Sequence, residues 1–318
     1  MGLHVRDLSV TYRTGAGPVR AVDSVSFDVA QGERLGLVGE SGSGKTTAAL
    51  ALMQMLQPPG RCEGGTALVD GTDLLALLPP QMQQHRLRTI SYIPQGAMNS
   101  LNPVHSVERQ MRNAMLDHGV SPGRREMRQL CITGLAGVGL GPEVLRRYPH
   151  ELSGGMKQRV CIAIGMLLGP KIIIADEPTS ALDVVSQRLV METLGREQEK
   201  SNAALLLIGH DIGLMAQFVT RLAVMYAGRL VEIGTIRQVL TQPRHPYTRA
   251  LIGSIPKLRQ RGVLSGIPGV APSLRQLPPG CAFHARCTVH VDRCLVERPA
   301  LDHDPGGHHA ACHLRDAA

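Results

Sequence analysis

The sequence predicts an α/β protein with a mostly parallel sheet, and three features indicate this. The run from Val29 to Gly39 reads as a strand with RLGLVGE as its buried part, followed by a glycine loop and the helical stretch TTAALALMQML. KIIIADEP (171–178) and AALLLIGHD (203–211) are short apolar runs bounded by turn residues, as central parallel strands are. RLAVMYAGRLVEIG (221–234) predicts two more strands joined at Ala227-Gly228.

Two other segments differ from this core. Residues from about 101 to 150 are polar, contain Arg and Met at helical spacing, and predict a helical insert subdomain. From about residue 241 the prolines spread the chain into loops, so we expect a boundary there. The expected organisation is a main domain over 1–240 and a small Cys-rich C-terminal extension over 241–318.

The composition narrows the class of protein. Hydrophobic residues make up 43% of the 318 residues, aromatics only 3%, and Trp is absent, so we expect an aliphatic core. No apolar run approaches the length that crosses a bilayer, and the start MGLHVRDLSVTYR reads as a first strand rather than a signal peptide. We therefore expect a cytosolic protein, in which structural disulfides are rare.

The charge is concentrated in the last quarter of the chain. Residues 241–318 carry 10 Lys+Arg against 5 Asp+Glu, so this segment is more basic than the rest. A basic tail can meet nucleic acid, an acidic membrane surface or an acidic partner, or it can be a solvated surface. Its only aromatic residues are Tyr247 and Phe283, too few to stack a single strand, and we expect no nucleic-acid partner.

A phosphate-binding motif follows the first buried strand. Gly39 to Thr46 fits G-x-x-x-x-G-K-[ST], and glycines of this kind let backbone N–H groups turn toward phosphate oxygens at a helix N-terminus. Lys45 is expected to reach the β- and γ-phosphates of ATP, and the Thr46 hydroxyl to bind Mg²⁺. The expected nucleotide-binding residues of this loop are Gly39, Ser41, Gly42, Ser43, Gly44, Lys45, Thr46 and Thr47.

Two adjacent carboxylates suggest hydrolysis. Asp176 ends a predicted buried strand, where a carboxylate is costly unless a cation or a hydrogen-bond partner meets it. A hydrated Mg²⁺ shared with Thr46 and the phosphates would meet it. Glu177 follows directly and is the candidate general base for the attacking water.

A further motif lies just before this strand. LSGGMKQR (152–159) reads as a Ser-Gly-Gly turn that opens a helix, which is a second anion-binding surface. Together with the phosphate loop, IIIADEP, SALD (180–183) and His210, in this order, it resembles the ATP-binding-cassette ATPases. The resemblance covers residues 1 to about 240.

The resemblance implies roles for particular residues. Six positions match functional residues of the family. Tyr12 matches the residue that stacks on adenine, Gln95 the residue that contacts Mg²⁺ or the attacking water, and His210 the residue that contacts the γ-phosphate. Ser153 and Gly155 match groups that contact the ATP of the opposite subunit, and Asp183 matches the dimer-crossing loop. It also implies that two chains join head to tail around ATP.

Further partners follow from the same resemblance. Since no membrane span is predicted, the resemblance implies two separate transmembrane permease subunits, an extracytoplasmic substrate-binding protein and a second, non-identical ATPase subunit at the cytoplasmic face of the membrane. We expect the helical insert to dock on the permeases. A cassette ATPase that is not coupled to transport, and an importer of nickel or another small solute, are the alternatives.

Four cysteines remain unexplained by the cassette. Cys281, Cys287, Cys294 and Cys312 are spaced C-x5-C-x6-C-x17-C, and four thiolates can form a zinc site, hold an iron–sulfur cluster or remain reduced thiols. With RHPYTRALIGSIP (244–256), they resemble the C-terminal extension of the peptide- and nickel-importer ATPases. That resemblance implies a [4Fe–4S] cluster.

Overall fold

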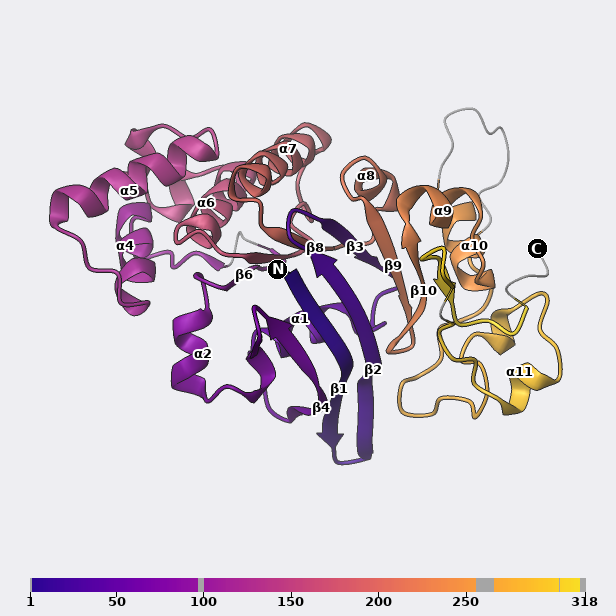
Figure 1. Ribbon diagram of the computed structural model, residues 1–318. Coiled ribbons are helices and arrows are strands. Elements are labelled where there is room, and N and C mark those ends of the chain that lie inside the picture. Colours follow the sequence, from indigo (N-terminus) through magenta and orange to yellow (C-terminus); the bar gives the residue numbers. More distant parts are fainter. Residues whose placement is uncertain (1, 97–99, 256–265, 303, 315–318) are drawn as a thin grey trace. The chain divides into compact units, whose positions relative to one another are not determined.

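The computed structural model describes residues 2–96, 100–255, 266–302 and 304–314 (Figure 1). The chain divides into two compact units. Unit 1 comprises the described residues of 1–3, 28–33 and 68–207, and unit 2 comprises those of 4–27, 34–67 and 208–318. The phosphate loop and the region after residue 240 therefore belong to the same unit, while the expected domain boundary near residue 241 stays a prediction.

Unit 2 contains strands from two sheets. In one, β1 (Gly2–Thr14) lies between β2 (Gly17–Ala30) and β4 (Gly60–Val69). In the other, the order is β11 (His309–Ala310), β10 (Arg229–Thr235), β9 (Arg221–Tyr226) and β3 (Arg34–Val38). β3 and β9 are parallel, while β10 is antiparallel to both of its neighbours. The predicted turn between β9 and β10 is confirmed, with positive φ at Ala227 and Gly228 as a tight hairpin requires.

The first predicted strand and helix are both shorter than expected. Val29 belongs to β2, because a turn closed by the Glu33 N–H to the Ala30 carbonyl separates β2 from β3, with Gly32 at φ 75°. The helix α1 (Lys45–Leu52) ends before the QPPG sequence, since Gln54 adopts a φ of 49° that no helix continues through. The other helices of unit 2 are α8 (Ile212–Ala216), α9 (Ile236–Thr241), α10 (Pro246–Gly253), α11 (Arg293–Val296) and the 3₁₀ turn η4 (His284–Arg286).

Unit 1 carries the remaining parallel strands. Its strand order is β8 (Ala204–Ile208), β7 (Ile172–Asp176) and β6 (Ile90–Ile93), and β6 runs parallel to β7. Every residue of β7 and β8 is buried, as the apolar runs predicted. The other elements are β5 (Thr72–Asp73), α2 (Pro79–His85), α4 (Val107–Asp117), α5 (Arg124–Gly137), α6 (Gly154–Met166), α7 (Val184–Ser201) and the 3₁₀ turns η1 (Leu74–Ala76), η2 (Pro142–Arg146) and η3 (Pro149–Glu151).

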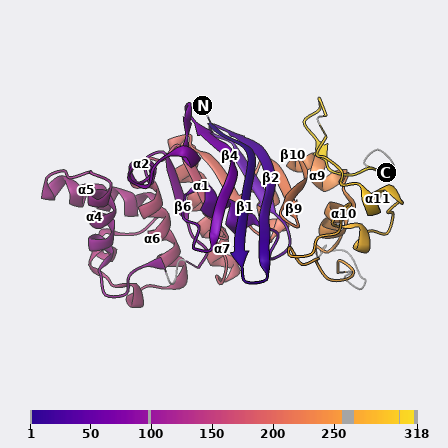
Figure 2. The same ribbon diagram turned by 90° about the horizontal axis from the view of Figure 1, so that it is seen from below.

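The segment predicted to be a helical insert is helical. α4 buries Val107, Met111 and Met115, and α5 likewise buries three residues at the same four-residue spacing. This spacing puts each set on one helix face. Figures 1 and 2 show α4 and α5 beside α6, with which both are in contact. Among the described residues, no helix is long and apolar enough to cross a membrane.

A buried carboxylate fixes the region after β10. Glu232 is fully buried, and its oxygens accept hydrogen bonds from the backbone N–H groups of Arg244 and His245 at 2.9 and 2.8 Å. The His308 ring nitrogen lies 2.8 Å from the same carboxylate, next to β11. One side chain of β10 therefore holds the start of α10 and the last strand in place.

Replacing Glu232 with alanine removes the acceptor for the backbone N–H groups of Arg244 and His245 and the partner of the buried His308. We expect Glu232→Ala to lower the free energy of unfolding by about 3 kcal/mol, because buried polar groups lose their partners. The control is Arg188→Ala, which breaks a solvent-exposed pair with Glu192 and should cost under about 0.5 kcal/mol. Urea denaturation measures both, and equal stability of the two variants would contradict this role of Glu232.

Candidate functional site

The phosphate loop connects β3 to α1 and depends on two glycines that have no room for a side chain. A Cβ at Gly39 would lie 2.2 Å from the Met225 carbonyl oxygen, and one at Gly44 would lie 2.3 Å from that of Ala21. Both glycines also have positive φ angles. The loop is thus packed against neighbouring backbone, and the sequence must have glycine at both positions.

Lys45 lies inside this loop. Its Nζ donates to the carbonyl oxygens of Gly39 and Glu40 at 2.8 and 2.9 Å and lies 3.3 Å from the Ser43 hydroxyl oxygen. Only 7% of Lys45 is exposed, whereas Ser41 and Thr46 are exposed. A nearly buried ammonium group surrounded by backbone dipoles gives the loop a positive centre suited to an anion.

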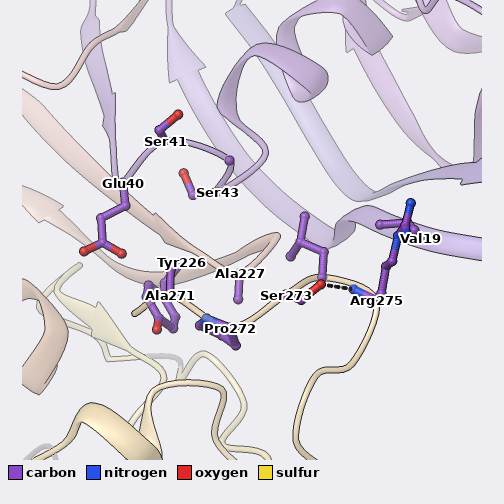
Figure 3. Close-up of a pocket in the computed structure, with 12 residues that line it drawn as sticks. Val19, Glu40, Ser41, Ser43, Tyr226, Ala227, Ala271, Pro272, Ser273 and Arg275 are labelled. Carbon is purple, nitrogen blue, oxygen red and sulfur yellow. Dashed lines mark hydrogen bonds between the residues drawn. The ribbon is translucent and has the colours of Figure 1, made fainter. Parts of the chain in front are cut away.

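A pocket of about 370 Å³ lies beside the loop (Figure 3). Residues Glu40 to Ser43 of the loop line it together with Tyr226, Ala227 and Val19 of β2. Residues 271–275 also line the pocket and were not among the predicted site residues. No motif marks these residues, since APSLR reads as an ordinary proline-containing loop.

Unit 1 carries the two candidate carboxylates. Asp176 is fully buried at the end of β7, and the Tyr92 hydroxyl donates to its Oδ2 at 3.0 Å. Burial and the negative charge of Asp176 raise the pKa of Tyr92 well above its usual value, so the hydroxyl stays protonated as a donor. Sequence reasoning missed Tyr92, which lies three residues before Gln95.

Glu177 is held in an uncommon backbone conformation. Its φ is 44°, and the turn that follows is closed by the Ser180 N–H and hydroxyl, which both donate to the Glu177 carbonyl oxygen. The Gln95 amide donates to the Glu177 carboxylate at 2.9 Å. The structure therefore brings Gln95 and Glu177 together, and an observed positive φ at a polar residue often accompanies a functional position.

The Ser-Gly-Gly turn and Asp183 belong to one surface of unit 1. Ser153 caps α6 and Asp183 caps α7, each by accepting a backbone N–H. A Cβ at Gly155 would lie 3.2 Å from the Ser186 hydroxyl oxygen, and this hydroxyl donates to Asp183. These bonds from Ser186 also lower the pKa of Asp183, which keeps the exposed carboxylate charged.

Val184 and Val185 follow Asp183 and are 80% and 78% exposed. Two neighbouring β-branched apolar side chains that are both exposed to water are unusual for a single chain. They follow Asp183, which accepts a hydrogen bond from Ser186, and Ser186 lies next to Gly155 of the Ser-Gly-Gly turn.

Tyr12 and His210 lie in unit 2. The Tyr12 ring packs on Gly60, where a Cβ would lie 2.7 Å from Cε1, and Tyr12 is not among the residues lining the phosphate-loop pocket. His210 is exposed after β8, and the Gly209 N–H before it donates to Leu37 of β3 at 3.2 Å. The backbone of residue 209 therefore lies next to the strand from which the phosphate loop begins.

The four C-terminal cysteines line one small pocket, of about 10 Å³, together with His284 and other residues. All four are thiols without a disulfide. Burial raises the pKa of the Cys281 thiol to about 11, and the proximity of Cys294, Cys312 and Cys287 adds to this shift. Among the described residues, no group of three or more His, Cys, Asp and Glu side chains has the arrangement of a metal site, so the expected cluster is not confirmed.

Two family models match segments of this chain. A family model described as ABC transporter matches residues 22–180, and one described as Oligopeptide/dipeptide transporter, C-terminal region, matches residues 231–294. The solved ATP-binding cassette MJ0796, in a dimeric post-hydrolysis state bound to ADP and Pi, superimposes with a TM-score of 0.66 at 24% identity, over 74% of this chain and 99% of that one. This likeness shows that the fold is the cassette fold.

Curated relatives are similar over nearly the whole length. The dipeptide transport ATP-binding protein DppD of Escherichia coli (strain K12) is 40% identical over 313 residues, which are 98% of this chain and 96% of the relative. DppD of Bacillus subtilis (strain 168) is 40% identical over 99% of this chain and 95% of its own length. This chain therefore belongs to the ATPase subunits of ABC transporters, in the dipeptide and oligopeptide import family.

Proposed function

We propose that this chain hydrolyses ATP at the phosphate loop to power peptide import through separate membrane subunits. The observation that carries the proposal is the loop itself, with a nearly buried Lys45 at its centre and a 370 Å³ pocket beside it. A pocket of this volume suits a small-molecule ligand, and the positive centre suits its phosphates. Peptide as the cargo class is supported by the match of residues 231–294 and by relatives named as dipeptide transport proteins.

The loop residues bind the phosphates. Backbone N–H groups of the loop from Gly39 to Gly44 donate to phosphate oxygens, and the Lys45 ammonium, released from its loop carbonyls, pairs with the β- and γ-phosphates. Thr46, Gln95 and Asp176 are the proposed magnesium ligands, with oxygen donors as Mg²⁺ prefers. When bound there, Mg²⁺ would neutralise charge on the phosphates. Tyr92 holds the Asp176 carboxylate in a fixed direction through its hydroxyl.

Glu177 is the proposed general base. A water oxygen attacks the γ-phosphorus while its proton passes to the Glu177 carboxylate, and the bond from the β,γ-bridging oxygen to the γ-phosphorus breaks, giving ADP and phosphate. Gln95 donates to the same carboxylate and thereby orients it. His210 is the proposed contact to the γ-phosphate, and Tyr12 to adenine.

A second ATPase subunit completes each site. Ser153 and Gly155 contact the nucleotide of the opposite subunit, and Asp183 lies at the crossing between subunits. Support comes from the shared surface of these residues and from the exposed Val184 and Val185 beside it, which a partner would cover. The MJ0796 cassette, of the same fold, was solved as a dimer. We propose a non-identical partner.

The remaining proposed partners couple ATP hydrolysis by this chain to transport across a membrane. Two transmembrane permeases and an extracytoplasmic substrate-binding protein complete the proposed transporter, and this chain lies at the cytoplasmic face. The helical subdomain of about residues 101–150 docks on the permeases. Leu116 and Leu130 on α4 and α5 are partly exposed apolar residues suited to such a contact. Nickel or another small solute is the alternative cargo.

The four cysteines are proposed to hold a [4Fe–4S] cluster with a structural role. The described side chains are not arranged as a metal site, but the four thiols line one pocket and are the type of donor that such a cluster takes; zinc is the alternative. A bound group would replace four S–H groups, of which the one on Cys294 is buried, with coordinated thiolates and would stabilise a region rich in loops.

Replacing the proposed base tests the hydrolysis. Glu177→Gln keeps the size of the side chain but cannot accept the proton, so we expect ATP turnover to fall at least about 100-fold while ATP binding is retained. Steady-state phosphate release and calorimetric binding measure the two quantities. Glu192→Gln, at an exposed surface glutamate, is the control and should keep wild-type turnover. Wild-type turnover in Glu177→Gln would contradict the assignment.

Metal analysis tests the cysteine site. We expect protein purified without oxygen to contain about four iron and four acid-labile sulfide per chain, and Cys287→Ser to lose them. Cys131→Ser, at a buried cysteine of α5, is the control and should retain the iron. About one zinc per chain would indicate a zinc site in place of the cluster. Metal-free protein would contradict both the iron–sulfur proposal and the zinc alternative.

A further inference from the structure

The pocket beside the phosphate loop has a wall that the cassette motifs do not supply. Residues 271–275 come from the C-terminal region and line the pocket opposite Ser41 to Ser43 (Figure 3). Val19 of β2 and Arg275 both line this pocket. A ligand whose phosphates occupy the loop would therefore extend between Val19 and this wall.

One guanidinium group holds the wall and the loop together. Arg286 donates through its two terminal nitrogens to both carboxylate oxygens of Glu40, the second residue of the loop, at 2.8 and 2.9 Å. Its Nε donates to the Pro268 carbonyl oxygen at 2.7 Å, at the start of the segment that leads to residues 271–275. The Arg286 side chain is only 6% exposed, so this arrangement is fixed by packing.

The turn after Pro268 packs on the same side chain. Gly269 has a φ of 72°, and a Cβ there would lie 3.3 Å from the Arg286 Cγ. Tyr247 adds a second link, because its hydroxyl oxygen accepts the Glu40 backbone N–H at 2.8 Å. The position of the wall relative to the phosphate loop thus depends on contacts within unit 2.

The wall carries groups that suit the nucleoside half of a nucleotide. Pro272 and Leu274 are half-buried apolar side chains that can pack on a base, and Arg275 is an exposed cation. A guanidinium group stacks on aromatic faces and hydrogen-bonds to hydroxyl groups, and its charge favours an anionic ligand.

We propose that residues 271–275 form the second wall of the nucleotide site, with Arg275 contacting the base and ribose of ATP. Arg286 is the positioning residue that holds this wall against the loop. The C-terminal region thereby takes part in binding the nucleotide of its own chain. The inference rests on the proposed nucleotide site at the phosphate loop.

Calorimetric titration of the full chain tests the inference with two ligands, Mg–ADP and inorganic tripolyphosphate. Arg275→Ala should weaken ADP binding about three- to fivefold and leave tripolyphosphate binding unchanged, because tripolyphosphate has no base or ribose. Gln276→Ala, an exposed neighbour that does not line the pocket, should bind both ligands like the wild type.

The outcomes separate this inference from the proposed function. Lys45→Ala should lose both ligands, because it removes the central cation of the loop. If it does so while Arg275→Ala binds ADP like the wild type, the inference is wrong and the nucleotide site stands. Equal weakening of both ligands by Arg275→Ala would also overturn the inference. Wild-type protein that binds neither ligand would overturn the nucleotide site and the inference together.

Discussion

The ion pair between Arg286 and Glu40 is the interaction on which the arrangement of unit 2 depends. A nearly buried guanidinium group is costly to remove from water, and here two charge-assisted hydrogen bonds to one carboxylate offset that cost. The rings of Tyr226 and Phe283 lie 5.8 and 5.7 Å from the guanidinium carbon. Hydrogen bonding to Glu40 raises the pKa of Arg286 above its already high value, so the charge persists at every working pH.

This pair explains how a loop-rich C-terminal region can be ordered in a chain with so few aromatic residues. The chain has five tyrosines and three phenylalanines, and three of these rings, Tyr226, Tyr247 and Phe283, pack on one another with centroids 4.5 to 5.5 Å apart. Tyr226 ends β9, whereas Tyr247 and Phe283 come from the C-terminal region. The region therefore shares its core with the sheet that carries the phosphate loop.

The four cysteines adjoin this core. Arg286 lies in the 3₁₀ turn between Cys281 and Cys287, so the backbone that positions two thiols also positions the guanidinium group bound to the phosphate loop. A group bound by the thiols would stiffen this turn. The cysteine pocket and the nucleotide pocket are therefore connected through a single short segment of chain.

The sequence predicted local features well and long-range contacts poorly. The glycine pattern of residues 39–46 identified the phosphate loop, and the apolar runs identified β7, β8, β9 and β10, because these signals are contained in consecutive residues. The boundary between β2 and β3 at Gly32 was not predicted, because a single glycine turn interrupts an otherwise strand-like run there. Arg286 and Glu40 are 246 positions apart, and neither residue type is unusual in its surroundings, so no local pattern could reveal their contact. The same holds for Tyr92 and Asp176, which meet only when β6 pairs with β7.

The central claim is that the phosphate loop and the C-terminal region act as one nucleotide-binding unit. A double-mutant cycle on ADP affinity tests it most directly, using Glu40→Ala, Arg286→Ala and the double variant at a temperature where all are folded. We expect the double variant to bind ADP no more weakly than the weaker single variant, with a coupling above about 1 kcal/mol. Losses in binding free energy that simply add would contradict it.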